Sequence, residues 1–418
     1  MNNHYRSPHS IRVLLCEGSS LSAREAISAL GPLGYVLDVC DPDPQCLGRF
    51  SRFVHAFYRC PPMGSDPQGY LQFLLQHLKQ EHYNVLLPVQ EQAFLFSKVR
   101  DQLQQLVGLA VADFADFERL QSKVGFLHVL DHLELPHPRT ALIRTRAELE
   151  ACNTFPYYLK TAYGTASSGV WLITTADERQ DVIRQLESAG ELDGTTELLV
   201  QEVVAGALCM VQAIFDQGRL VAMHCWQRIK EGARGSSSSK VSIDQPVVRQ
   251  HMERLGEYLH WHGCLAIDYL LSPVESTPLY IDANPRLVEC MNAALSGLNL
   301  AEMQVRLSLQ EQLPPSVASR PAVRSHMLMM AVLHMAGKGG MRREVLRESW
   351  LALRHRGSYA GSEEELTPLK ADMLAGLPLM LVLINLLIDP ARGKRIADRA
   401  VARYSLTPAA IQTIRYKM

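Results

Sequence analysis

Apolar and polar positions alternate in blocks at the start of the chain. Apolar, β-branched runs at 11–16 and 35–40 have the length of buried strands, and a stretch with apolar residues at helical spacing, 23–30, separates them. A second such stretch, 70–82, carries leucines on one helical face. Strand, helix and strand in this order predict a βαβ unit with a right-handed crossover. We therefore expect an α/β domain over residues 1–115.

A further apolar run in this domain, 84–89, ends in Gln90 and Glu91. Open α/β sheets bind ligands at the carboxyl ends of their strands. These two side chains could therefore line a cleft, and a helix cap facing water fits the same pattern. The turn 17–20 holds one glycine where a dinucleotide fingerprint needs three. We expect this domain to be a scaffold and not the nucleotide site.

The pattern between residues 116 and 312 predicts a second, two-part domain. Strands are expected at 155–160 and 197–201, with a helix over 176–188 between them. These elements would form a subdomain over about 150–205. A pair of amphipathic helices at 115–130 leads into it and carries Lys123, which by itself is typical of a solvated helix lysine.

Two carboxylates end neighbouring apolar runs near the close of this domain. Asp268 follows one run, and Asp282 follows the next and begins the sequence Asp-Ala-Asn-Pro-Arg, which contains Asn284 and Arg286. A turn-rich segment joins the runs, so a hairpin would bring both acids to one end. Carboxylate and amide oxygens suit Mg²⁺, and an arginine could hold a phosphoryl oxygen. An exposed hairpin with polar ends is the alternative.

A loop rich in small residues directly follows the strand that ends in Lys160. Small residues let backbone N–H groups approach anionic oxygens, and the lysine supplies a positive charge. The loop lacks the Gly-Lys-Ser/Thr of a P-loop, and its position predicts a flap over phosphates. The candidate flap residues are Gly164, Ser167, Ser168 and Gly169.

A cationic segment rich in glycine and serine spans residues 226–240. It contains Lys230 and Arg234, and we expect it to be a loop between strands. Arginine followed by serine donors is a plausible anion site, whereas glycine and serine runs also occur as flexible linkers. The close spacing of the cations favours the site.

A proline-rich boundary near residue 313 introduces a methionine-rich region, 313–418, which we expect to be mainly helical. Within it, residues 373–388 are strongly apolar but fall short of the ~20 residues that a membrane-spanning helix needs. We expect a buried helix or an oligomer interface, and peripheral contact with a membrane surface stays open because basic residues follow.

Composition and charge limit the binding partners and the cellular compartment that we expect for this protein. The 418 residues contain 42 Lys and Arg against 43 Asp and Glu, so the net charge of −1 does not favour nucleic acid or an anionic membrane as partner. The nine cysteines lack the spacing of a zinc or redox motif. With no signal-peptide pattern at the start, we expect a cytoplasmic protein with reduced thiols.

Taken in chain order, these features resemble the ATP-grasp superfamily, of the carbamoyl phosphate synthetase and biotin carboxylase type. The resemblance covers roughly residues 11–312 and is most specific from Asp268 to Arg286. It implies an α/β fold (α+β ATP-grasp), with ATP and Mg²⁺ or Mn²⁺ as cofactors. The residues it implies are Lys123 and Lys160 for the phosphates; Gln201, Glu202 and Val204 for adenine; Asp268, Asp282 and Asn284 for the metal; and Arg286, Arg234 and Lys230 for the reacting groups.

Three positions depart from the family pattern. The second metal acid is usually Glu, and this chain has Asp282. The first is commonly Glu or Gln, and this chain has Asp268. Leu208 stands where an acid often binds ribose, so the ribose contacts are unassigned.

The resemblance implies an ATP-dependent ligase that activates a carboxylate as an acyl phosphate and joins it to an amine, such as an amino acid. Both substrates would be small molecules, and we expect a homodimer. One alternative is a carboxylase or phosphotransferase acting on bicarbonate or an enol-type oxygen, although no biotin-carrier motif follows. Another is a regulatory protein that binds ATP without turnover.

Overall fold

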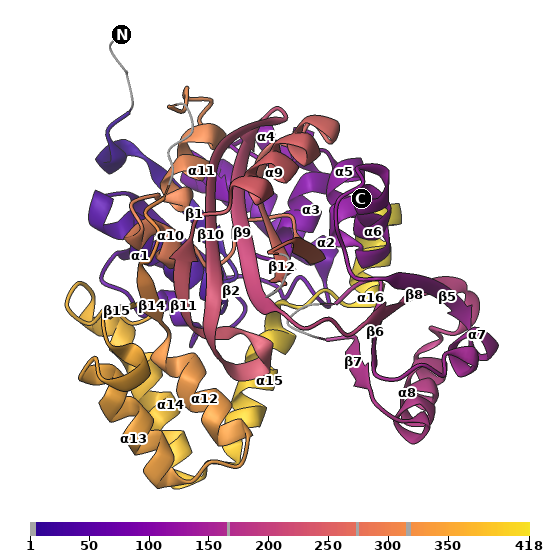
Figure 1. Ribbon diagram of the computed structural model, residues 1–418. Helices are drawn as coiled ribbons and strands as arrows, with labels where there is room; N and C mark the ends of the chain where they lie inside the picture. The colour runs from indigo at the N-terminus through magenta and orange to yellow at the C-terminus, as the bar shows by residue number, and fades with distance from the viewer. Residues whose placement is uncertain (1–5, 165–167, 273–275, 315–318) are drawn as a thin grey trace.

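The computed structural model describes residues 6–164, 168–272, 276–314 and 319–418. Three sheets organise these residues, and helices cover them (Figure 1). The largest apolar core joins the N-terminal unit to the largest sheet, where Phe117 stacks on Trp261 with ring centroids 6.1 Å apart. The expected α/β architecture with a helical C-terminal region is confirmed.

The N-terminal sheet is four-stranded and parallel, in the order β3-β2-β1-β4. The predicted strands and helices are confirmed, and β3 was not foreseen. The elements are β1 (Arg12–Cys16), α1 (Leu21–Leu30), β2 (Val36–Asp41), β3 (Val54–Arg59), α2 (Pro67–Glu81), β4 (Val85–Leu87), α3 (Gln92–Lys98), α4 (Arg100–Gln104), α5 (Phe114–Gln121) and α6 (Lys123–His132).

A small antiparallel sheet, in the order β5-β8-β6-β7, forms a lobe that stands apart from the rest of the molecule (Figure 1). The apolar faces of two helices cover it. The elements are β5 (Thr140–Thr145), α7 (Arg146–Ala151), β6 (Tyr157–Thr161), β7 (Val170–Ile173), α8 (Ala176–Ala189) and β8 (Asp193–Glu202).

The large sheet has seven strands in the order β13-β12-β9-β10-β11-β14-β15. Its predicted hairpin is confirmed, because Asp268 of β12 pairs directly with Asp282 of β13. The elements are β9 (Ala207–Asp216), β10 (Arg219–Glu231), β11 (Ser237–Ile243), α9 (Pro246–Tyr258), β12 (Gly263–Leu271), β13 (Pro278–Asn284), α10 (Met291–Leu295), α11 (Leu300–Ser308), β14 (Arg324–His326) and β15 (Ser362–Glu364).

The expectation of a long loop over residues 226–240 was wrong. Strand β10 continues to Glu231 and β11 begins at Ser237, so only a short 3-10 turn, η4 (Ala233–Gly235), separates them. The two strands pair antiparallel, with Arg228 opposite Lys240. Backbone pairing satisfies the N–H and C=O groups of this polar segment and lets its serines lie buried.

The C-terminal region is mainly helical, as expected, and packs beside η4. Strands β14 and β15 extend the large sheet beyond residue 312, so the domain boundaries stay a prediction. The helices are α12 (Leu328–Gly337), α13 (Arg342–Leu353), α14 (Gly376–Ile388), α15 (Arg392–Tyr404) and α16 (Pro408–Lys417).

The apolar segment 373–388 is not a buried helix. One side of α14 packs through Leu379 and Leu386, while other apolar side chains are exposed by 39–81%: Met373, Leu374, Leu377, Met380, Leu381, Ile384 and Ile388. Among the described residues, no helix combines the length and apolarity that crossing a membrane requires. An oligomer interface or membrane-surface contact stays a prediction.

The last helix, α16, returns to the N-terminal part of the chain and packs on α2 and α3. Its Arg415 pairs with Glu118 of α5 and donates to the hydroxyl of Tyr163. The guanidinium of Arg415 also lies 4.9 Å from the centre of the Tyr163 ring. The C-terminal helix therefore contacts the residue that directly precedes Gly164.

Candidate active site

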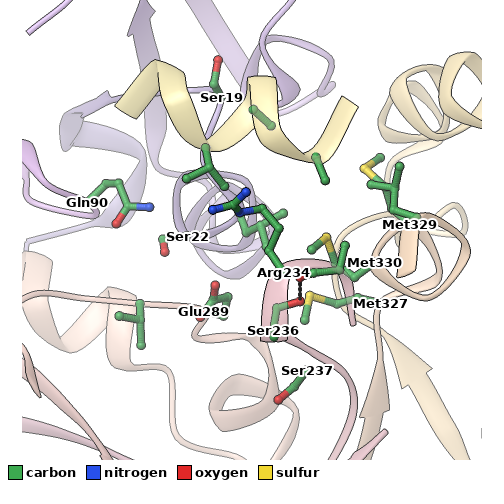
Figure 2. A pocket seen from close by; sticks show the side chains of 18 of the residues that line it. Ser19, Ser22, Gln90, Arg234, Ser236, Ser237, Glu289, Met327, Met329 and Met330 are labelled. Carbon is green, nitrogen blue, oxygen red and sulfur yellow. Dashed lines mark hydrogen bonds between the residues drawn. The ribbon is translucent and has the colours of Figure 1, made fainter. Parts of the chain in front are cut away.

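A cavity of about 710 Å³ lies where the large sheet, the small lobe, the N-terminal unit and the C-terminal helices meet. Its size is within the range of small-molecule sites. Figure 2 shows side chains from the N-terminal unit, the large sheet and the C-terminal helices converging on it. Among the expected site residues, those that line it are Lys123, Lys160, Gly164, Ser168, Arg234, Asp268, Asp282, Asn284 and Arg286.

The hairpin places its acids and amide on one face at one end of the cavity. Asp268 and Asp282 are opposite each other in the register, and Asn284 is two residues further along, hence on the same face. The amide Nδ2 of Asn284 lies 3.5 Å from Oδ2 of Asp268. Burial, together with the negative charges of Asp282 and Glu289, raises the pKa of Asp268 to about 8. This end of the cavity therefore favours a cation.

This donor set fits Mg²⁺ bound together with a nucleotide. Among the described residues, no group of three or more His, Cys, Asp and Glu side chains is arranged to hold a metal. The candidate instead offers two carboxylates, with the amide of Asn284 beside them. Mg²⁺ is usually held by one or two carboxylates, with phosphates and water completing its octahedron.

The two lysines approach the same acids from the other side. Lys123 begins α6, and its Nζ lies 3.2 Å from Oδ1 of Asp282. Lys160 lies on β6, and its Nζ donates to the carbonyl of Ile281 at 3.4 Å. Burial lowers the pKa of Lys160 to about 8, with the nearby charge of Lys123 acting in the same direction. Two buried cations beside a carboxylate pair suit bound phosphates.

The glycine-rich turn between β6 and β7 completes this end. Gly164 and Ser168 line the cavity, and Ser167 is outside the described residues. Gly169 has φ +71°, and its carbonyl accepts a hydrogen bond from the N–H of Thr161 at 2.9 Å. A Cβ at Gly169 would lie 2.1 Å from Oγ1 of Thr161, so this turn requires glycine.

The residues expected to read adenine, Gln201, Glu202 and Val204, are not among those that line the cavity. Gln201 donates to Oγ1 of Thr140 at 3.0 Å, and the Glu202 carboxylate accepts from the N–H of Arg139 at 2.7 Å. Both bonds join β8 to the segment at the start of β5, which explains the orientation of these side chains. A backbone role for this hinge stays a prediction.

Arg286 is fixed by three partners at the back of the cavity. Its Nε donates to Oε1 of Gln90 at 2.7 Å, and one terminal nitrogen donates to Oδ1 of Asn284 at 2.9 Å. The other lies 2.9 Å from Oε1 of Glu91, and both side chains of this ion pair are buried, at 7% and 2% exposure. Gln90 lines the cavity as the sequence suggested.

The two expected cations of the segment 226–240 separate. Arg234 lies in η4 with φ +55°, lines the cavity and pairs with Asp398 of α15. Lys230 does not line the cavity and pairs with Glu348 of α13. Lys230 is therefore not placed to act on a substrate.

Sequence reasoning missed several lining residues. Glu289 points into the cavity (Figure 2), three residues beyond Arg286. Lys240 is buried, with its Nζ 2.9 Å from Oε2 of Glu365. Leu208 and Met210 of β9 supply apolar walls. The cluster Met327, Met329 and Met330 was visible as a methionine-rich stretch, but only the fold brings it here.

Comparison with known proteins places these features in a family context. No protein-family model matches the chain. It is similar to a D-aspartate ligase of Enterococcus faecium, 24% identical over 282 residues that cover 60% of this chain and 66% of the ligase. It is also similar to the C-terminal section of a carbamoyl phosphate synthase large chain from Methanopyrus kandleri, 21% identical over 48% of this chain and 39% of that protein. The matched region thus spans less than two thirds of either relative.

Solved structures share the arrangement of elements. An L-amino acid ligase from Bacillus licheniformis superposes with a TM-score of 0.58 at 15% identity, covering 76% of this chain and 80% of that one. A biotin carboxylase–β,γ-ATP complex from Campylobacter jejuni gives a TM-score of 0.60 at 13% identity, covering 76% and 75%. At these identities the likeness shows the fold, and the chain has the ATP-grasp fold that the order of its motifs resembles.

Proposed function

We propose that the protein is an ATP- and Mg²⁺-dependent ligase that joins a small carboxylic acid to an amine. The observation that carries this proposal is the convergence of Lys123, Lys160, Asp268 and Asp282 at one end of a single cavity. Two buried lysines suit phosphate oxygens, and the facing acids suit the cation that accompanies them. The similarity to a D-aspartate ligase and the fold shared with an L-amino acid ligase support the proposal.

The reaction proceeds in two displacements. A carboxylate oxygen of the acid attacks the γ-phosphorus of ATP, the bond to ADP breaks, and an acyl phosphate forms. The amine then attacks the acyl carbon, the bond to phosphate breaks, and the amine loses a proton. Bound Mg²⁺ would neutralise charge on the transferring phosphoryl group.

The side chains of this chain position and neutralise the reacting groups. Lys123 and Lys160 would hold the nucleotide phosphates under the turn that carries Gly164 and Ser168. The guanidinium of Arg286 is preorganised by Gln90, Asn284 and Glu91, so little reorganisation is needed to stabilise charge on the substrate side. Arg234, which also lines the cavity, would bind a substrate carboxylate.

The size of the cavity favours a ligase over the carboxylase or phosphotransferase alternative. Bicarbonate needs little space, whereas the cavity of about 710 Å³ continues beyond Arg286 between the C-terminal helices. The regulatory alternative predicts ATP binding without turnover. The three expected metal residues and both expected lysines line the cavity, which supports an enzyme.

The test is release of ADP and phosphate across a panel of carboxylic acids and amines, amino acids included. We expect Asp282→Ala to lower turnover by a factor on the order of 100 or more. Asp244→Ala, on the exposed turn after β11, is the matched control and should retain activity. ATP binding without release for any pair would contradict the ligase proposal, as would full activity of Asp282→Ala.

A further inference from the structure

The cavity continues past the hairpin acids into an apolar compartment built by the C-terminal helices. We define this methionine compartment by Met327, Met329 and Met330 at the start of α12, Leu381 of α14, and Ile396 and Ala400 of α15. Figure 2 shows the three methionines gathered on one side of the cavity, next to Arg234. None of these residues belongs to the phosphate end.

Methionine makes this compartment adaptable to the shape of an apolar group. Its side chain is unbranched and its thioether is polarisable, so methionines can repack around different apolar groups. The phosphates of a nucleotide do not require such a wall, because charged groups near Lys160 and Asp282 suit them. The compartment is therefore suited to an apolar group on one of the other substrates.

Polar groups of both signs stand at the mouth of the compartment. Arg234 and Ser236 lie beside the methionines, and Glu289 faces them across the cavity (Figure 2). In the part of the chain that the structure describes, the Glu289 carboxylate has no hydrogen-bond or ion-pair partner, although its backbone carbonyl accepts from Gln212 at 2.6 Å. A carboxylate facing a cavity without a partner suits an ammonium group.

We propose that one of the two substrates is an α-amino acid with a large apolar side chain. The side chain occupies the methionine compartment, the ammonium group binds Glu289, and the carboxylate lies toward Arg234 and Arg286. This inference rests on the proposed ligase function and names the substrate class for the same cavity. Its physical basis is the combination of apolar walls with Glu289 and Arg234 at the mouth of the compartment.

The test compares phosphate release with L-leucine, L-methionine and L-phenylalanine against L-asparagine, L-glutamine and L-alanine, each paired with a panel of second substrates. We expect a preference of roughly tenfold or more for the apolar side chains, because a methylene in an apolar pocket discriminates by about that factor. The same acids without the amino group should react poorly. Preference for polar or small amino acids would overturn the inference and leave the ligase function standing.

Variants separate the compartment from the rest of the cavity. Ala400→Phe fills it and should raise KM for L-leucine by at least roughly tenfold, with KM for ATP unchanged. Ala391→Phe, at the exposed start of the same helix, is the control and should change neither value. Met330→Gln keeps the length of the side chain, adds polarity and should reduce the apolar preference even if Ala400→Phe fails to fold. An equal effect of Ala400→Phe on large and small substrates would overturn the inference.

Direct binding distinguishes the two proposals. If no amino acid releases phosphate, the ligase function fails, and calorimetric titration of L-methionine and L-leucine into the protein still tests the compartment. Binding that Ala400→Phe weakens supports the assigned class of ligand. Absence of binding by wild-type protein overturns it.

Discussion

Replacing Arg286 with methionine should destabilise the fold through the carboxylate that it leaves behind. Arg286 and Glu91 form a buried ion pair at 2.9 Å, with 7% and 2% of their side chains exposed. Removal of one partner of such a pair costs about 3–5 kcal/mol of unfolding free energy, because the other charge stays buried without a counter-charge. Glu17 is buried nearby, and burial together with the charge of Glu91 raises its pKa, so the arginine supports two acids.

The assay is urea unfolding of purified variants, followed by tryptophan fluorescence at neutral pH. Arg286→Met should lower the transition midpoint strongly, and the double variant Arg286→Met/Glu91→Gln should recover part of the loss because the stranded charge is gone. Arg119→Met is the matched control, since Arg119 pairs with Asp116 at the surface at 3.1 Å. Such a pair contributes about 0–1 kcal/mol.

Two outcomes would refute this reasoning. A loss for Arg286→Met no larger than that for Arg119→Met would show that Glu91 does not depend on the arginine. A double variant as unstable as the single variant would show that the cost comes from lost packing and not from charge.

Three further predictions follow from the structure. Gly169→Ala should weaken ATP binding, measured by titration, because the added Cβ would clash with Thr161. Gly190→Ala is the control: Gly190 also has a positive φ, but a Cβ there would have no atom within 4 Å, so ATP binding should be kept. Burial raises the pKa of Glu364 to about 7, above the 4.5 of an exposed carboxyl, so its contribution to stability is complete below the unfolded pKa and is lost as pH rises to about 7. Glu364→Gln should therefore make the unfolding midpoint depend less on pH between pH 5 and 7. A pH dependence identical to that of the wild-type protein would contradict the raised pKa of Glu364. Chelation of divalent cations should abolish phosphate release, and added Mg²⁺ or Mn²⁺ should restore it; turnover that persists in EDTA would exclude the metal site.

The sequence pattern predicted that the acids and lysines at one end of the cavity would lie close together, because each either follows an apolar run that forms a strand or begins a helix. Asp268 and Asp282 each follow an apolar run, and pairing of those runs is enough to bring the acids together. Lys160 follows the same logic on β6. Local pattern sufficed here because the period of a strand dictates which side chains share a face.

The substrate end could not be predicted in the same way. In the sequence, Lys230 and Arg234 appear equivalent. In the fold, α13 supplies Glu348 as the partner of Lys230, and α15 supplies Asp398 as the partner of Arg234. Glu289 lies in no recognisable sequence motif, and its proposed role depends on the cavity that its carboxylate faces. These positions are set by packing between segments more than 100 residues apart, which local periodicity does not contain.

The contact between Arg415 and Tyr163 joins residues 252 positions apart. Tyr163 directly precedes Gly164, so the energy of the turn proposed to cover the nucleotide includes a contribution from α16. Thermodynamic linkage makes such a dependence mutual. A partner that displaces α16 from α2 and α3 would change the affinity for nucleotide, and bound nucleotide would change the affinity for that partner by the same factor. The position of the C-terminal helix α16 is thus energetically coupled to the candidate active site.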